Sequence, residues 1–193
     1  ERFPRNVGFV NAFGQTETTS TLTLLGPDDH RLDGTPAEVE RRTKRLTSIG
    51  RPLPDVEVQI VGEEGGVLGA GEVGEIHVRT PRVMKGYAGS AQSPLVRDGW
   101  LPTRDMGWMD EDGYLFIAGR KDDMIIRGGE NIAPAEVEAV LQSHPLVEEA
   151  AVVGIPDVEW GQRVAAFVVL RPGGALGADA LGEFCRQRLA SFK

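Results

Sequence analysis

Two short segments of this 193-residue chain carry residue types that suit binding of a phosphorylated ligand. Thr16 and Glu17 are adjacent, and a hydroxyl beside a carboxylate can hold a phosphate and a hard cation such as Mg²⁺ together. Arg120 and Asp122 lie on a tight connection between two apolar segments, and a planar guanidinium suits ribose and phosphate oxygens. Together with the following Gly128-Gly129 pair, these residues predict a nucleotide site and a hinge.

Each of these segments also has a simpler interpretation. A Thr-Glu pair in a polar stretch is typical of a helix cap. Arg120 could form an exposed ion pair with Asp122 or Asp123, which would contribute little to stability. Gly128-Gly129 could be only a tight turn after a strand. These alternatives remain open on residue types alone.

Several longer segments, taken in order along the chain, resemble the motifs of adenylate-forming enzymes. This superfamily contains acyl-CoA synthetases, luciferases and peptide-synthetase adenylation domains, and the chain is most like an acyl-CoA synthetase. The resemblance covers essentially the whole chain and continues to Lys193. The segments that carry it are Phe13–Glu17 (FGQTE), Gly74–Ile76 with Gly86-Tyr87, Asp98–Trp100 with Thr103, Asp105 and Gly107, Gly113–Glu138, and Trp160–Gln162.

The first motif implies a nucleotide-binding and catalytic segment. By resemblance, Thr16 contacts the phosphate of ATP or of the adenylate, and Glu17 binds Mg. Phe13 and Gly14 belong to the same cofactor-binding motif, with Phe13 or its neighbours against the adenine or lining the acyl pocket. A buried core position is the alternative for Phe13.

The later motifs imply further contacts with the cofactors. Asp105 would accept hydrogen bonds from the two ribose hydroxyls, although Arg104 stands where the superfamily has a glycine. Arg120 would bind the ribose near the phosphate, and Gly129 would let the pantetheine chain of coenzyme A pass closely. Asp122 aligns with the hinge about which the small domain of such enzymes swings.

The resemblance also implies the fold class, which is α/β (α+β). Residues 1–119 are expected to be the β-rich end of the large N-terminal AMP-binding domain, 120–122 the hinge, and 123–193 a small, incomplete α+β C-terminal domain. The phosphate loop and the C-terminal catalytic lysine of the superfamily do not occur in this sequence. We therefore expect a fragment that is inactive without the N-terminal segment of the same enzyme.

Hydrophobic periodicity and turn residues predict the elements that position these motifs. A strand at Val7–Val10 should deliver the Thr-Glu motif into a polar loop, and Asp179 should cap the last helix. The other predicted elements are a helix at Pro36–Arg42, a hairpin of Val56–Ile60 with Val73–Val78, a strand at Tyr114–Ala118, a helix from Pro134, and strands at Val147–Val153 and Arg163–Leu170.

Composition excludes several classes of protein. A net charge of −8 argues against bulk nucleic-acid binding, which needs clusters of Lys and Arg. No apolar run is long enough for a transmembrane segment, and the single Cys185 cannot form an internal disulfide. The three histidines have no metal-ligand spacing, so no zinc site is expected. A cytoplasmic location is the default expectation.

The resemblance implies an ATP-dependent acid-CoA ligase of the fatty acyl-CoA synthetase type, which uses ATP/AMP, Mg and coenzyme A. The enzyme would adenylate a carboxylic acid and then pass the acyl group to coenzyme A. One alternative is a peptide-synthetase adenylation domain, which hands its adenylate to a carrier protein. The other is a non-catalytic binding fragment. The identity of the acid is not readable from these residues.

Overall fold

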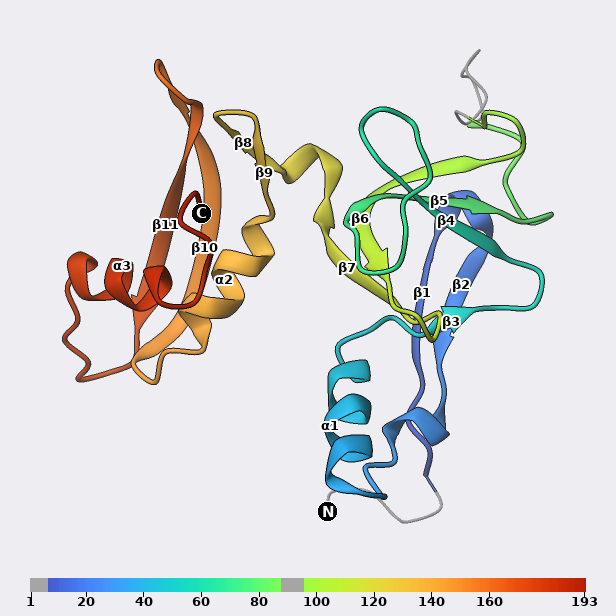
Figure 1. Ribbon diagram of the computed structural model, residues 1–193, viewed down its shortest axis with the longest axis horizontal. Helices are drawn as coiled ribbons and strands as arrows, with labels where there is room; N and C mark the ends of the chain where they lie inside the picture. The colour runs from blue at the N-terminus through green and yellow to red at the C-terminus, as the bar shows by residue number, and fades with distance from the viewer. Residues whose placement is uncertain (1–6, 88–95) are drawn as a thin grey trace. The chain divides into compact units, whose positions relative to one another are not determined.

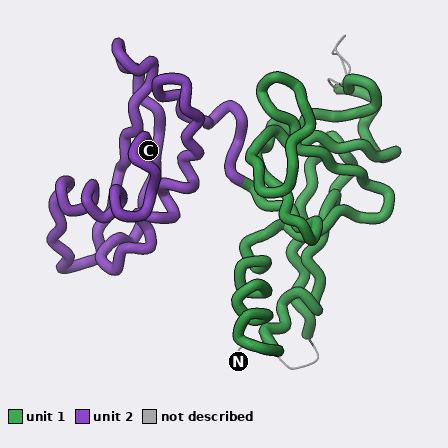
Figure 2. The backbone as a smooth tube through the Cα atoms, viewed as in Figure 1, with its two compact units in different colours: residues 1–117 green, residues 118–193 purple. Residues whose placement is uncertain are grey.

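The computed structural model describes residues 7–87 and 96–193. The chain forms two compact units, Glu1–Ile117 and Ala118–Lys193, which Figure 2 shows in separate colours. Each unit has its own buried apolar cluster, so each is described by itself.

The first unit is built mainly from two β-sheets (Figure 1). One sheet has the order β1-β2-β3, and the other has the order β4-β5-β6-β7. Helix α1 (Pro36–Arg45) begins with a capping box between Thr35 and Glu38. It confirms the helix that was predicted from Pro36. The strands are β1 (Asn11–Gln15), β2 (Ser20–Leu25), β3 (Arg51–Pro52), β4 (Glu57–Val61), β5 (Gly74–Arg79), β6 (Leu101–Met109) and β7 (Leu115–Arg120). The last three residues of β7 belong to the second unit.

The predicted hairpin in this unit is confirmed. β4 and β5 pair antiparallel, with Ile60 opposite Ile76 and Val58 opposite Val78. Side chains alternate between the two faces of a strand, so the period-two apolar residues point to one side. Ile60, Ile76 and Val78 are buried in the core of this unit, with Val58 packed against it.

The second unit combines a four-stranded sheet with two helices. The sheet has the order β10-β11-β8-β9. Val137 and Leu141 of the first helix share a core with Val152, and Leu181 and Cys185 of the second helix pack against it. The elements are β8 (Ile125–Arg127), β9 (Glu130–Ile132), α2 (Pro134–Gln142), β10 (Val147–Asp157), β11 (Gly161–Leu170) and α3 (Ala178–Arg186). This mixture of helices and strands confirms the predicted α+β class.

Two of the predicted local features are wrong. The first strand is Asn11–Gln15 and not Val7–Val10, which lies outside regular structure; pairing with β2 across the polar Asn11–Gln15 segment outweighs the apolar character of Val7–Val10. The last helix begins after Gly177, and Asp179 lies in its first turn with no side-chain capping bond at the N-terminus. An acidic residue in the first turn still favours the helix through its dipole.

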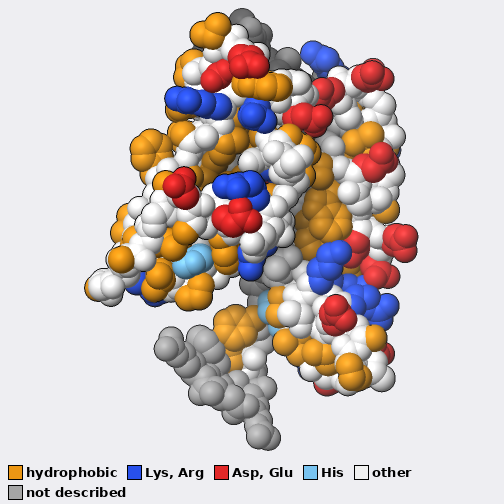
Figure 3. Space-filling view, turned by 60° about the vertical axis from the view of Figure 1, so that its left-hand side comes forward, with side chains coloured by type: hydrophobic (Ala, Val, Ile, Leu, Met, Phe, Trp, Pro, Cys, Tyr) orange, Lys and Arg blue, Asp and Glu red, His pale blue; other side chains and the backbone are white. Residues whose placement is uncertain are grey.

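The surface carries mixed charges. On the face that Figure 3 shows, Lys and Arg side chains are interspersed with Asp and Glu and do not form one basic stripe. Within the residues that the structure describes, none of the helices has the length and apolar character needed to cross a membrane.

A small buried cluster around Tyr114 completes the first unit. Tyr114 is 3% exposed and lies with Leu25 and Phe116. Its hydroxyl donates a hydrogen bond of 2.5 Å to Asp29. Burial and this bond to Asp29 raise the pKa of Tyr114 above its ordinary value.

We expect Tyr114→Phe to destabilise the chain by about 1 to 3 kcal/mol, because the Asp29 carboxylate loses a donor in a partly buried position. Urea unfolding measures this difference. Tyr87→Phe is the matched control, since Tyr87 is 56% exposed; equal stability losses for both variants would contradict this account of Tyr114.

Candidate nucleotide-binding site

The Thr16-Glu17 pair lies on a tight turn between two paired strands. β1 ends at Gln15, Thr16–Thr18 form one turn of 3-10 helix, and β2 begins at Ser20. The pairing of β1 with β2 is irregular between Phe13 and Gly14, which brings the backbone of Ser20 onto Gly14. A Cβ added at Gly14 would lie 1.8 Å from the Ser20 carbonyl oxygen, so only glycine fits.

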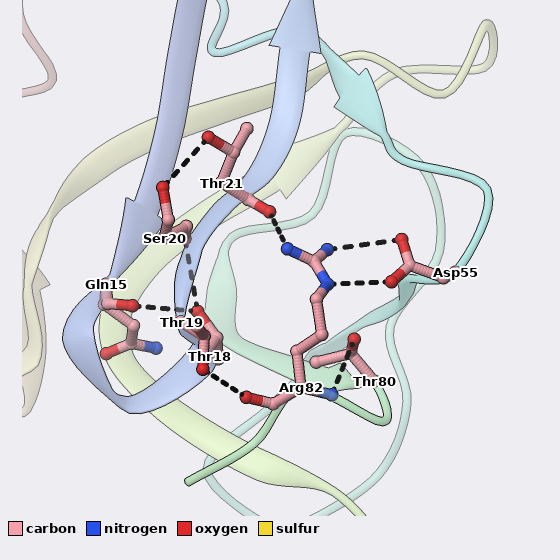
Figure 4. A network of polar contacts seen from close by, with 8 residues as sticks. All are labelled: Gln15, Thr18, Thr19, Ser20, Thr21, Asp55, Thr80 and Arg82. Atoms are coloured by element: carbon pink, nitrogen blue, oxygen red, sulfur yellow. Dashed lines mark hydrogen bonds and ion pairs between the residues drawn. The ribbon is translucent and has the colours of Figure 1, made fainter.

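The exit from this turn is held in an unfavourable backbone conformation. Thr19 has φ 54° and Ser20 has φ 89°, values that cost about 1 to 2 kcal/mol each for residues with a Cβ. Local hydrogen bonds compensate for this: the buried Thr18 hydroxyl donates to the Gln15 carbonyl at 3.0 Å, and the Thr19 hydroxyl donates to the Arg82 carbonyl at 2.9 Å (Figure 4). Backbone strain kept in place by surrounding contacts is typical of functional sites.

Glu17 is fixed at both its backbone and its side chain. Its carbonyl accepts a 2.7 Å hydrogen bond from the Met84 N–H, and its carboxylate accepts one from the Tyr87 hydroxyl. The bond to Glu17 raises the pKa of Tyr87 above its ordinary value. The alternative that this pair caps a helix is wrong. Thr16 and Glu17 lie inside the 3-10 turn, and the residue at its N-cap position is Gln15.

The donor set of this turn fits a magnesium ion bound together with a phosphate. Thr16 and Glu17 offer a hydroxyl and a carboxylate, the oxygen ligands that Mg²⁺ prefers, and a carboxylate has about four acceptor sites, so a bond from Tyr87 is compatible with a metal. Across residues 7–87 and 96–193, no group of three or more His, Cys, Asp or Glu could hold a metal by itself. A site of this kind needs phosphate oxygens to complete it.

One shallow depression is lined by three of the predicted site residues, Phe13, Gly14 and Thr16. Its volume is about 490 Å³. Phe13 is half-buried and packs against the core of the first unit. Its contact with the adenine or the acyl pocket stays a prediction. In the described part of the chain, the buried side-chain nitrogen of Gln15 has no hydrogen-bond partner, which marks this rim as polar. The lining residues are Ala12, Phe13, Gly14, Gln15, Thr16, Ser20 and Thr21.

Asp105 lies on a β-bulge rather than in this depression. The register between β5 and β6 shifts after Glu75, so that Thr103, Arg104 and Asp105 oppose one residue. Arg104 has φ 63°, a conformation that glycine adopts without steric cost, which explains why a glycine would suit this position. Asp105 is 6% exposed, and its N–H donates to the Thr103 hydroxyl at 3.1 Å. Its contact with a ribose stays a prediction.

Arg120 and Asp122 meet at a second pocket, which lies within the second unit and has a volume of about 410 Å³. Arg120 ends β7, and Asp122 is exposed in the 3-10 turn Lys121–Asp123 that follows. The pocket wall also includes Glu138 and Gln162. These two side chains are fixed by backbone donors, since Glu138 accepts from Val152 N–H at 2.8 Å and Gln162 accepts from Ile126 N–H at 2.7 Å.

Gly128-Gly129 forms a two-residue hairpin turn. β8 and β9 pair with Arg127 opposite Glu130, and both glycines have positive φ, 58° and 89°. A Cβ added at Gly128 would lie 2.8 Å from the Trp160 ring, whereas one at Gly129 would contact nothing within 4 Å. The passage of a pantetheine chain over Gly129 stays a prediction.

Two sequence models of known protein families match this chain. The sequence model of the AMP-binding enzyme family matches residues 1–88, and that of the AMP-binding enzyme C-terminal domain matches residues 136–193. The chain belongs to the AMP-binding enzyme family. The family relationship therefore accounts for both units, and it confirms the resemblance to adenylate-forming enzymes.

Two relatives of this chain are acid-CoA ligases. A 2-succinylbenzoate-CoA ligase of Geobacillus kaustophilus is 42% identical over 191 residues, which are 98% of this chain and 36% of the relative. A long-chain-fatty-acid-CoA ligase of Bacillus subtilis is 48% identical over 149 residues, 76% of this chain and 27% of the relative. The chain thus spans about a third of the length of these enzymes.

A solved structure has the same fold. The o-succinylbenzoate coenzyme A synthetase of Bacillus subtilis, in complex with ATP and magnesium ion, matches with a TM-score of 0.76 and 38% sequence identity. The match covers 95% of this chain and 36% of that one. It confirms the predicted fold class, that of the C-terminal part of an adenylate-forming enzyme.

Sequence reasoning missed three residues that shape these sites. Arg82 and Tyr87 bind the Thr16–Thr21 segment, and Gln162 lines the pocket of Arg120. Tyr87 could have been found from its place in the Gly-Tyr motif. Arg82 has no comparable signal, because its partners are distant in sequence.

We expect Gly14→Ala to destabilise the chain by at least about 2 kcal/mol, because its methyl group would overlap the Ser20 carbonyl. Gly66→Ala is the control, since a Cβ at Gly66 has nothing within 4 Å. Urea unfolding of both variants checks this, and a neutral Gly14→Ala would show that the strands do not close so tightly.

Proposed function

We propose that this chain is the C-terminal part of an ATP-dependent acid-CoA ligase. The observation that carries the proposal is the fixed Thr16–Glu17 turn beside a depression that Thr16 lines, in a chain of the AMP-binding enzyme family. The enzyme would join a carboxylic acid to AMP with release of pyrophosphate, and then transfer the acyl group to the thiol of coenzyme A. An N-terminal segment of the same enzyme would complete the site.

In the first step, the chain's residues would hold the phosphates and balance their charge. The Thr16 hydroxyl donates to a phosphate oxygen while the acid's carboxylate oxygen attacks the α-phosphorus and pyrophosphate leaves. Glu17 holds the magnesium ion, which when bound offsets negative charge on the phosphates. Positioning and charge neutralisation supply most of the catalysis in phosphoryl chemistry.

The remaining predicted residues would serve the nucleotide and the second step. Asp105 accepts hydrogen bonds from the ribose hydroxyls, and Arg120 binds the ribose and stabilises charge near the phosphate. Phe13 and Gly14 contact the adenine end of the nucleotide. Gly129 leaves the hairpin tip without a side chain where pantetheine passes.

Asp122 would act as the hinge between the adenylation and thioester-forming states. It lies in the one-turn connection Lys121–Asp123, outside the strands, where a few dihedral angles can change without disrupting a sheet. The boundary between the two compact units falls close by, at Ile117 and Ala118.

The family match does not select the acid, because the relatives act on 2-succinylbenzoate and on long-chain fatty acids. A fatty acid is the substrate we test first, with an aromatic acid beside it. Carboxylate-dependent exchange of pyrophosphate into ATP identifies the acid, and transfer to coenzyme A separates a ligase from an adenylation domain that uses a carrier protein. The 193-residue chain alone should show no exchange.

Glu17→Gln in the full-length enzyme is expected to reduce pyrophosphate exchange by at least about tenfold and to raise the Mg²⁺ concentration required, because an amide is a weaker ligand for Mg²⁺. Glu64→Gln, at an exposed turn, is the control and should be unchanged. An unaltered Mg²⁺ requirement in Glu17→Gln would remove Glu17 from the metal site.

Asp122→Pro should change the ratio of the adenylation rate to the thioester-forming rate by about tenfold or more, because proline fixes φ near −65°. Single-turnover measurements of the two half-reactions give this ratio. Asp122→Ala, which removes the carboxylate but leaves the backbone free, should keep the ratio near that of the unaltered enzyme. Equal losses in both half-reactions for Asp122→Pro would contradict the hinge role.

A further inference from the structure

Arg82 lies at the centre of a polar network that joins the Thr16–Ser20 turn to the segment after β5 (Figure 4). Its guanidinium donates to the Thr21 carbonyl at 2.6 Å and to the two carboxylate oxygens of Asp55 at 2.7 and 3.2 Å. Its own carbonyl accepts from the Thr19 hydroxyl at 2.9 Å, and its N–H donates to Thr80 at 3.4 Å. Arg82 therefore contacts the turn through both side chain and backbone.

These contacts reach the strained part of the turn. Thr19 and Ser20 have positive φ. The hydrogen bonds that Arg82 accepts from Thr19 and donates to Thr21 hold the residues on either side of Ser20. The opposite side of the turn is held by the close approach of Ser20 to Gly14. The conformation that presents Thr16 and Glu17 thus depends on contacts from outside the turn, as strained segments require.

The same segment reaches Glu17 two and five residues further along. Met84 N–H donates to the Glu17 carbonyl, and the Tyr87 hydroxyl donates to the Glu17 carboxylate. The segment Thr80–Tyr87, which we call the brace, therefore contacts the turn at three successive places: Arg82, Met84 and Tyr87.

An exposed ion pair with Asp55 is the simpler interpretation of Arg82, and such a pair would contribute little. The Arg82 side chain is only 27% exposed, and its bond to the Thr21 carbonyl cannot be part of an ion pair. Arg79 offers a direct comparison, since it forms a paired contact with Glu57 in which neither residue touches the turn.

We propose that the brace positions the Thr16–Glu17 pair for the nucleotide and its magnesium ion, with Arg82 as the anchor and Tyr87 as the residue that orients the Glu17 carboxylate. Both are positioning residues that act through the turn. This inference rests on the proposed function of Thr16 and Glu17.

The anchor is tested by hydrogen-deuterium exchange in the full-length enzyme, with Arg82→Ala against Arg79→Ala. Arg82→Ala should speed amide exchange of residues 15–21 at least about tenfold, because local opening of the turn becomes easier. Arg79→Ala removes the same charge at the end of β5, three residues before Arg82, and should leave exchange of residues 15–21 unchanged. Equal exchange of residues 15–21 in the two variants would overturn the anchor role.

The orienting role is tested with Tyr87→Phe, which removes only the hydroxyl. Calorimetric titration with ATP at several Mg²⁺ concentrations should show a several-fold higher Mg²⁺ requirement for tight ATP binding, with an unchanged melting temperature. Tyr114→Phe, which loses the bond to Asp29 outside the turn, should lower the melting temperature and leave the Mg²⁺ requirement unchanged.

The outcomes separate this inference from the function on which it rests. If the unaltered enzyme binds ATP with Mg²⁺ and exchanges pyrophosphate, but Tyr87→Phe has the same Mg²⁺ requirement, the orienting role is wrong and the proposed function stands. If the unaltered enzyme neither binds ATP nor exchanges pyrophosphate, the proposed function fails first. A steady-state split supports positioning: Arg82→Ala should lower kcat more than it raises KM for the acid.

Discussion

The structure of the candidate site depends on one close approach, that of the Ser20 backbone to Gly14. Because Gly14 has no side chain, β1 and β2 can close around a single 3-10 turn. In this closed turn Thr19 and Ser20 have positive φ. Such a turn is not stable by itself, since it combines strain with exposed polar groups. The Thr18 hydroxyl and the contacts from Thr80–Tyr87 stabilise it, and they leave Thr16 at the rim of the depression.

In the second unit, too, glycine allows two strands to close around a short turn. Two glycines at positive φ close the β8-β9 hairpin, and Trp160 covers the first of them, with the Arg127 guanidinium 4.8 Å from the ring centre. Glu138 and Gln162 bind backbone N–H groups and so fix the wall of the pocket that Arg120 lines. In each unit, paired strands supply rigidity and a short connection carries the candidate residues.

How much could be predicted depended on the range of the interactions. The β4-β5 hairpin follows from period-two apolar residues, and helix α1 follows from a proline beside a capping threonine, both of which are local patterns. Val7–Val10 was a wrong strand because pairing with β2, and not local hydrophobicity, selects Asn11–Gln15. The role of Arg82 in the brace was not predictable, since Asp55 and Thr21 are 27 and 61 residues away from it. The sequence showed that Arg104 replaces a glycine of the superfamily, but it did not predict the β-bulge at this position.

The most direct test of the central claim is hydrogen-deuterium exchange of the full-length enzyme with and without ATP and Mg²⁺. When the nucleotide binds, exchange of residues 13–21 and of the segment around Arg120 should become slower, because these amides lie at the proposed contacts. Binding of ATP, verified by calorimetry, with no change in residues 13–21 would contradict the claim that the Thr16–Glu17 turn holds the nucleotide.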